Sequence, residues 1–242
     1  MACIERTVQG VERKASMDAQ VNLETLDYTP IEQVPELERA FRTARLHINQ
    51  TRTSLGLPPV QMSYSDVRLI SGQDYSLYVD GPDCKKPSAG RFNHDTGLAF
   101  VRKSISLDNK FGLVYLASVM IHEMWHKALG NGFSERDLDL YEGLTEFLAR
   151  KTMGFVKPRI LGPSELSEDK ARIERVLGYE KPAKTFSGEI IVSLASGACL
   201  YHSYLDKMRE VESLARYCPR DFKRFLGDVF TWDSPRAERK AA

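Results

Sequence analysis

The chain has 242 residues, a formal net charge of +1 and 42% hydrophobic residues. These values fit one globular domain, or one domain with two lobes, that buries a sizeable core. A net charge this close to zero argues against nucleic-acid binding driven by bulk charge. No run approaches the roughly 18 apolar residues that cross a bilayer, so neither a nucleic-acid partner nor a membrane span is expected.

The N-terminal segment and the cysteines predict the compartment. Residues 1–6 are charged and lack the apolar core of a secretory signal. The four cysteines form no Cys-x-x-Cys pair and lie at Cys3, Cys84, Cys199 and Cys218. Without a signal we expect free thiols in the cytoplasm, whereas secretion follows if a signal has been removed.

The first part of the chain predicts an arm followed by a helix. Residues 1–34 are expected to form an N-terminal arm, partly flexible, or an early strand. From Pro35 to Leu55 apolar residues recur at helical spacing, before Gly56 and two prolines break the pattern. His47 lies on this helix, where a packing role is favoured over a metal role.

Between residues 60 and 106 the pattern changes to period two, which predicts strands. The expected strands are Val60–Ile70, Tyr75–Val79, Arg91–His94 and Leu98–Ser104. Asp95-Thr96-Gly97 is expected to form a hairpin turn between the last two. His94 borders this hairpin and is interpreted as a turn residue without a catalytic role.

A buried helix is expected next, ending near Leu129. Its apolar residues recur every three or four positions, at Leu113, Leu116, Ala117, Met120, Ile121 and Met124. Ser106 or Asp108 is expected to cap its start, and Gly130 to end it.

This helix carries a His-Glu-x-x-His motif at residues 122–126. Residues four apart share one helical face, so His122 and His126 can bind one metal ion from adjacent turns. Glu123 is placed to act on a metal-bound water instead of ligating the metal.

A second helix, residues 139–149, carries three carboxylates on one stripe. Fifteen residues separate His126 from Glu142, and Asp139 and Glu146 lie three and four positions to either side of it. Burying three carboxylates without a cation is costly. A divalent metal with its histidine ligands would compensate them.

His122-Glu123-x-x-His126 followed by Glu142-Gly143-Leu-Thr-Glu146 resembles the gluzincin division of zinc metallopeptidases, over roughly residues 90–155. The spacing is shorter than in thermolysin-like and aminopeptidase-N-like enzymes, so the resemblance extends to the division only. It implies one Zn²⁺ held by His122, His126 and Glu142, with Glu123 as general base and acid. Gly143 would let the two helices approach closely.

The resemblance also implies a fold: α+β, zincin-like and two-lobed, with a small, mostly antiparallel sheet before the motif helix. Residues 35–155 would form the catalytic core and residues 156–242 a helical C-terminal subdomain. In such enzymes an edge strand pairs with an extended peptide, and Leu98–Lys103 is the strand expected to do so. The alternative is an ordinary edge strand protected by Arg102 and Lys103.

The C-terminal part predicts a linker and three helices. The linker follows Gly154 and contains Pro158 and Pro163, and the helices span residues 164–177, 187–208 and 219–230. Candidate donors to an oxyanion are Tyr179, Tyr201, His202 and Tyr204, each with packing as the alternative.

The expected function is hydrolysis of peptide bonds in a peptide or protein substrate by a zinc-bound water that Glu123 activates. Asp139 or Glu146 in place of Glu142 is one alternative for the third ligand. A second is a non-catalytic binding or regulatory module on the same fold. A third is a chance match within a core helix. The sequence indicates neither cleavage specificity nor oligomeric state.

Overall fold

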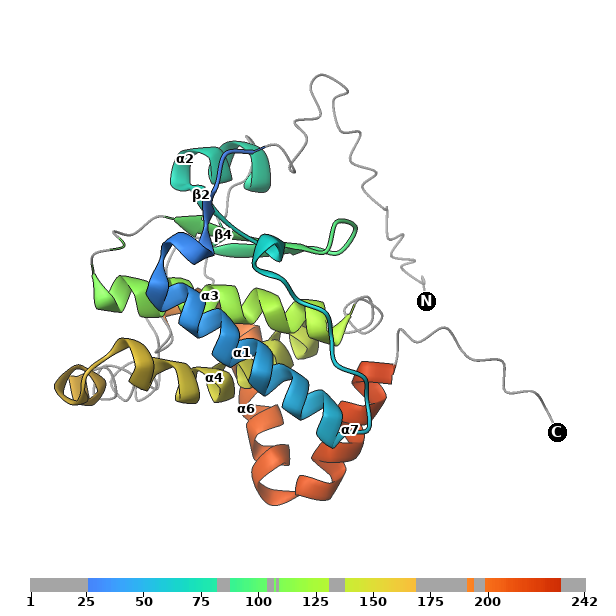
Figure 1. Cartoon of the computed structure of the whole chain (residues 1–242). Coiled ribbons are helices and arrows are strands. Elements are labelled where there is room, and N and C mark those ends of the chain that lie inside the picture. Colours follow the sequence, from blue (N-terminus) through green and yellow to red (C-terminus); the bar gives the residue numbers. More distant parts are fainter. Residues whose placement is uncertain are drawn as a thin grey trace, which may run out of the picture.

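The computed structural model describes residues 26–81, 88–103, 107, 109–130, 138–168, 191–193 and 199–231, and leaves out the side chains of 191–193, 199–205 and 231. The fold is mixed α+β, mostly helical, with a small four-stranded sheet (Figure 1). Among the described helices, none combines the length and apolarity that a membrane crossing needs.

The four-stranded sheet is mixed, with two antiparallel pairings and one parallel pairing. Its order is β1 (Thr29–Pro30), β2 (Val67–Ser71), β4 (Leu98–Lys103) and β3 (Gly90–Asn93). Only β2 and β4 run parallel. The expectation of a mostly antiparallel sheet before the motif helix is therefore confirmed.

The position of β4 corrects the expectation that it forms an edge. β4 pairs with β2 on one side and with β3 on the other, so both of its backbone edges are used. Its first four residues are buried, since Ala99 and Val101 join one core cluster and Leu98 and Phe100 join another. The edge strand on this side of the described sheet is β3, and β4 cannot take a peptide by strand addition.

The segment before β3 also differs from the prediction. The strand expected from Val60 begins only at Val67, after a 3-10 turn that Ser63 and Asp66 cap. Tyr75–Asp80 is a π-helix instead of a strand. Its two buried residues, Tyr75 and Val79, are four positions apart and cover the far face of the sheet, which suits helical periodicity better than alternation.

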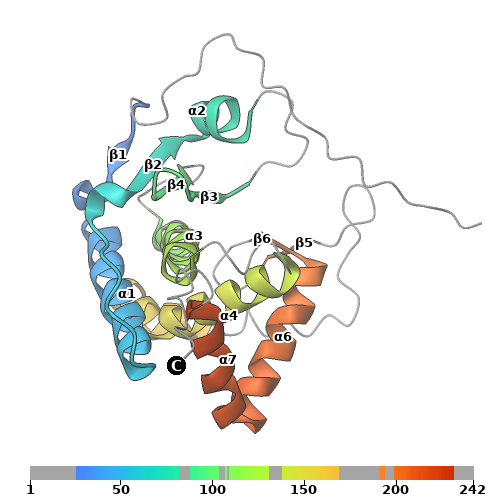
Figure 2. The same ribbon diagram turned by 90° about the vertical axis from the view of Figure 1, so that its right-hand side faces the viewer.

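Helix α3 (Lys110–Leu129) lies on the face of the sheet away from the π-helix, and the longer helices lie beside and beyond it (Figures 1 and 2). All of its residues are buried except Lys110, Phe111, Tyr115 and Lys127. Asn109, not Ser106 or Asp108, caps it by accepting from the amides of residues 111 and 112. Gly130 ends it with φ of 78°, as predicted.

Helices α1 (Pro35–Ser54) and α4 (Leu138–Ile160) pack against α3. The limits of α1 agree with the sequence. The linker expected after Gly154 is wrong, because α4 continues through Pro158 to Ile160. A proline in the last turn leaves most of the helical hydrogen bonds intact, and α4 thereby crosses the subdomain limit expected at residue 155.

The C-terminal part contains a hairpin where one long helix was expected. β5 (Ile191–Ser193) pairs with β6 (Cys199–Tyr201), and α6 (His202–Tyr217) follows directly. The β-branched run at residues 190–192 favours a strand locally, which explains the error. Helix α7 (Pro219–Thr231) agrees with the last predicted helix.

Gly143 permits a close approach, but to α6 instead of α3. A Cβ at Gly143 would lie 2.6 Å from the Lys207 Cβ and 2.7 Å from the Met208 amide nitrogen. The two helices that this glycine brings together are therefore α4 and α6. This contact fixes α4 through a helix other than the motif helix.

A buried hydroxyl joins three helices behind the motif. Thr152 of α4 donates to the Leu148 carbonyl and accepts from the Trp125 indole nitrogen at 3.0 Å. The His47 Nδ1 lies 2.9 Å from the same oxygen. His47 is therefore a packing residue that links α1 to α4.

Replacing Thr152 by valine should lower the free energy of unfolding by about 1–3 kcal/mol, because the indole N–H of Trp125 and the imidazole of His47 lose their buried partner. Thr145→Val is the matched control, since Thr145 is equally buried and donates only to the carbonyl four residues before it. Urea unfolding measures the free energy of unfolding of both variants. Equal decreases in this free energy would contradict the role of the shared hydroxyl.

Candidate metal centre

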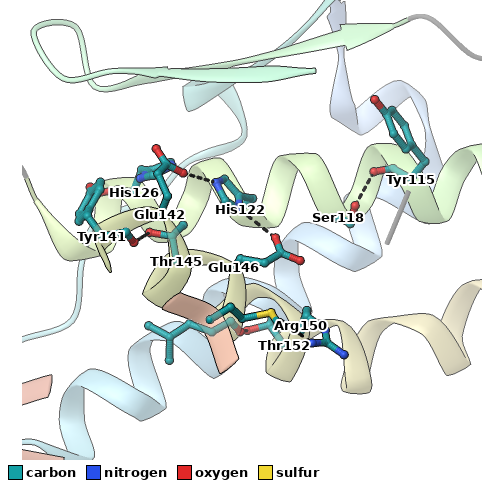
Figure 3. A network of polar contacts seen from close by, with 12 residues as sticks. Tyr115, Ser118, His122, His126, Tyr141, Glu142, Thr145, Glu146, Arg150 and Thr152 are labelled. Carbon is teal, nitrogen blue, oxygen red and sulfur yellow. Dashed lines mark hydrogen bonds and ion pairs between the residues drawn. The ribbon is translucent and has the colours of Figure 1, made fainter. Parts of the chain in front are cut away.

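Three side chains from two helices meet between α3 and α4 (Figure 3). His122 and His126 project from consecutive turns of α3, and Glu142 comes from the first turns of α4. Glu142 Oε2 lies 3.1 Å from His122 Nε2 and 3.4 Å from His126 Nε2. One ligand atom from each residue lies within 4.8 Å of the other two.

These separations suit a shared metal ion. Tetrahedral zinc with N and O ligands at about 2.0–2.1 Å places its ligands about 3.3–3.4 Å apart. The two distances from Glu142 Oε2, 3.1 and 3.4 Å, lie near that value. Two imidazoles and one carboxylate also form the donor set of catalytic zinc sites, which leave one position open. The three residues therefore fit a zinc ion.

Glu146 orients His122. Its Oε2 accepts from His122 Nδ1 at 3.2 Å, and the residue is 1% exposed. A proton held on Nδ1 leaves the Nε2 lone pair for a metal, as in other carboxylate–histidine–metal arrangements. Glu146 thus supports a ligand from the side away from the cluster and is not one of the three grouped donors.

Tyr141 orients His126 by different means. Among the described residues, His126 Nδ1 has no hydrogen-bond partner. Its ring instead packs against the Tyr141 ring, with centroids 5.0 Å apart. The Tyr141 hydroxyl donates to the carbonyls of Gly130 and His126 at 2.8 and 3.3 Å, which ties the end of α3 to the start of α4. Nothing in the sequence pattern singled out this residue, although it directly precedes Glu142.

Glu123 lies under strand β3. Its carboxylate accepts a hydrogen bond from the Phe92 backbone, and a Cβ at Gly90 would lie 2.6 Å from its Oε1. Only a glycine lets β3 come this close. Burial raises the pKa of Glu123, despite the neighbouring imidazoles, which suits a group that must take up a proton near neutral pH.

The carboxylates and imidazoles of the site alter one another's pKa. Burial alone would lower the pKa of His122, but its hydrogen bonds to Glu142 and Glu146 raise it well above the usual value. Burial alone would raise the pKa of Glu142, but the charge of His126 and its bonds to both imidazoles lower it strongly. The carboxylates of Glu142 and Glu146 thus stabilise a positive charge on the His122 imidazole that lies between them.

The other predicted residues lie elsewhere or outside the described part. Asp139 is in the first turn of α4, partly exposed and outside the cluster. His94 lies by the β3–β4 turn, with its ring 4.7 Å from that of Phe92. The side chains of Tyr201, His202 and Tyr204, and all of Tyr179, lie outside the described residues. An oxyanion donor therefore stays a prediction.

Comparisons of this chain with protein-family models, with curated proteins and with solved structures find no match. We therefore infer function from the motif residues and from the geometry that brings them together.

Replacing Glu146 by glutamine should weaken binding of Zn²⁺ by about 10–100-fold, because His122 loses the charged group that orients it. Asp139→Asn is the control, because Asp139 lies on the same helix but outside the cluster, and it should leave affinity unchanged. Competition with a chromophoric chelator measures both. Loss on Asp139→Asn would support Asp139 as the third ligand.

Zinc affinity should also rise with pH. A proton and a metal compete for the Nε2 of His122, and the raised pKa of this group keeps the proton bound to a higher pH than usual. Affinity should therefore increase until the pH exceeds that pKa and then level off. Chelator competition across the range from mildly acidic to mildly alkaline pH tests this, and a flat profile would contradict it.

Proposed function

We propose that the protein is a zinc-dependent peptidase of the gluzincin type, acting on a peptide or protein substrate. The observation that carries the proposal is the meeting of His122, His126 and Glu142 beside the buried carboxylate of Glu123. A purely structural zinc site is usually closed by four protein ligands. Three grouped donors beside a carboxylate with a raised pKa suit catalysis better.

A zinc ion held by His122, His126 and Glu142 would lower the pKa of a water and polarise the scissile carbonyl. Glu123 takes the proton from the attacking water and delivers it to the leaving amine. Glu146 keeps the His122 proton on Nδ1, and Tyr141 holds the His126 ring. The Phe92 amide holds one side of the Glu123 carboxylate, which limits the directions in which Glu123 can accept a proton.

The two-lobed arrangement of zincins is part of the same proposal. The sheet would form one side of the cleft and helices α4 and α6 the other, with α3 between them. The substrate-pairing role expected of Leu98–Lys103 passes to β3, the edge strand that lies against α3 near the site. A cytoplasmic location stays a prediction of the sequence.

The experiment compares wild type, Glu123→Gln and Glu142→Ala for zinc content and for cleavage of a quenched peptide library. Wild type should bind about one zinc ion per chain and cleave peptides. Glu123→Gln should keep the zinc and lose at least about 100-fold in turnover, because only proton transfer is removed. Glu142→Ala should lose both, and chelation followed by zinc should restore wild-type activity.

Other outcomes separate the alternatives. Zinc binding without cleavage of any peptide would favour the binding or regulatory module. A protein that takes up no zinc when prepared without chelator would contradict the proposal completely. Retention of zinc by Glu142→Ala together with its loss in Glu146→Ala would reassign the third ligand while keeping the chemistry.

A further inference from the structure

Lys127 connects three segments at one end of strand β3. It follows His126 on α3, and its Nζ lies 2.7 Å from Asp66 Oδ2 and 3.3 Å from the Gly97 carbonyl. Asp66 directly precedes β2, and Gly97 lies in the turn between β3 and β4. Both side chains of the ion pair are about three-quarters buried, at 23% and 24% exposure. This ion pair is therefore better shielded from water than a surface pair.

A second set of hydrogen bonds fixes the other end of β3. Ser88, two residues before the strand, donates from its hydroxyl to Asp80 Oδ1 at 2.7 Å. Its amide also donates to the Asp80 carboxylate, and its oxygen lies 2.9 Å from the Tyr75 hydroxyl. Tyr75 is fully buried. The π-helix that carries Tyr75 and Asp80 thus holds the start of β3.

Between these two ends, β3 lies directly on the helix face that carries Glu123. Gly90 comes so close that a Cβ there would lie 2.5 Å from Val119 Cγ1 and 2.6 Å from Glu123 Oε1. Two residues further on, the Phe92 backbone bonds to the same carboxylate. A shift of the hairpin would therefore move the groups that limit how Glu123 can turn.

Lys127 and Glu123 belong to the same interface. They lie four residues apart, hence on one face of α3, and both line a cavity of about 10 Å³ under the hairpin. Phe92 and Gly97 line it too.

We propose that Lys127 is a positioning residue, which holds the β3–β4 hairpin so that β3 keeps the Glu123 carboxylate in its reactive orientation. Ser88 serves the same purpose at the opposite end of the strand. The catalytic part of this inference rests on the proposed peptidase function. The structural part, which is the hold of the hairpin on Glu123, does not.

The test compares Lys127→Met and Ser88→Ala with Arg52→Met. Arg52 is a matched control, because it also binds the end of α3, donating to the Ala128 carbonyl at 2.6 Å. It does so from α1, with its guanidinium over the Phe230 ring, away from the hairpin. All three variants should lose stability, but only the first two release β3.

Two readouts are used for each variant. The first is hydrogen exchange at the Phe92 amide, measured by NMR without zinc and with it, which requires no activity. Exchange should be at least about tenfold faster in Lys127→Met and Ser88→Ala than in Arg52→Met. The second is kinetics on a cleaved peptide. There kcat should fall about 10–100-fold with zinc affinity and KM nearly unchanged, because a small misplacement of a reacting group is costly. Lys127→Arg keeps a charged donor at this position. Its Phe92 exchange rate and its kcat should therefore stay close to those of wild type.

The outcomes separate this inference from the proposed function. Unchanged exchange at the Phe92 amide in both Lys127→Met and Ser88→Ala would overturn the inference. Equal losses of kcat in Lys127→Met and Arg52→Met would overturn it too. Faster Phe92 exchange in a protein that cleaves no peptide would support the structural part and reject the peptidase.

Discussion

The constraint on which the rest of the structure depends is the enclosure of charged side chains around α3, with His122, His126, Glu142 and Glu146 between α3 and α4 and Glu123 under β3. Glu123 and Glu146 are 5% and 1% exposed, among buried residues that are mostly apolar. Isolated buried charges of this kind would cost several kcal/mol each. They are tolerated because every one of them contacts another group of opposite charge or a backbone donor. A divalent cation would complete this compensation, which is why the geometry favours a metal.

The surrounding elements can be understood from this constraint. Helix α3 has to be covered on all sides, so the sheet packs on one face and α1 and α4 on others. Thr152 and Arg52 hold the back and the end of α3, while Gly143 lets α6 press on α4. In the proposed peptidase, a rigid frame of this kind would keep the reacting groups in place without using the substrate's binding energy for it.

The two histidines are held in different ways, which makes the site asymmetric. His122 has a charged partner in Glu146, whereas the His126 ring packs on the Tyr141 ring and the His126 carbonyl accepts from the Tyr141 hydroxyl. A charged hydrogen bond raises the basicity of its imidazole, and ring packing does not. His122 is therefore expected to be the stronger metal ligand. Glu123 is placed by backbone atoms of β3, so its position depends on strand pairing and not on a neighbouring side chain.

The sequence by itself determined the motif helix, its glycine stop, helix α1 and the common face of His122 and His126. These features follow from local periodicity, since residues four apart share a face in any α-helix. It could not decide between Asp139, Glu142 and Glu146, because all three share one stripe and only the packing of α4 on α3 brings Glu142 to the histidines. The sequence also predicted that β4 is an edge strand and that Gly143 lies against α3, and neither prediction is correct. It gave no indication of the roles of Tyr141 and Lys127. Strand order and helix neighbours depend on contacts between residues far apart in the chain, which only the tertiary structure decides.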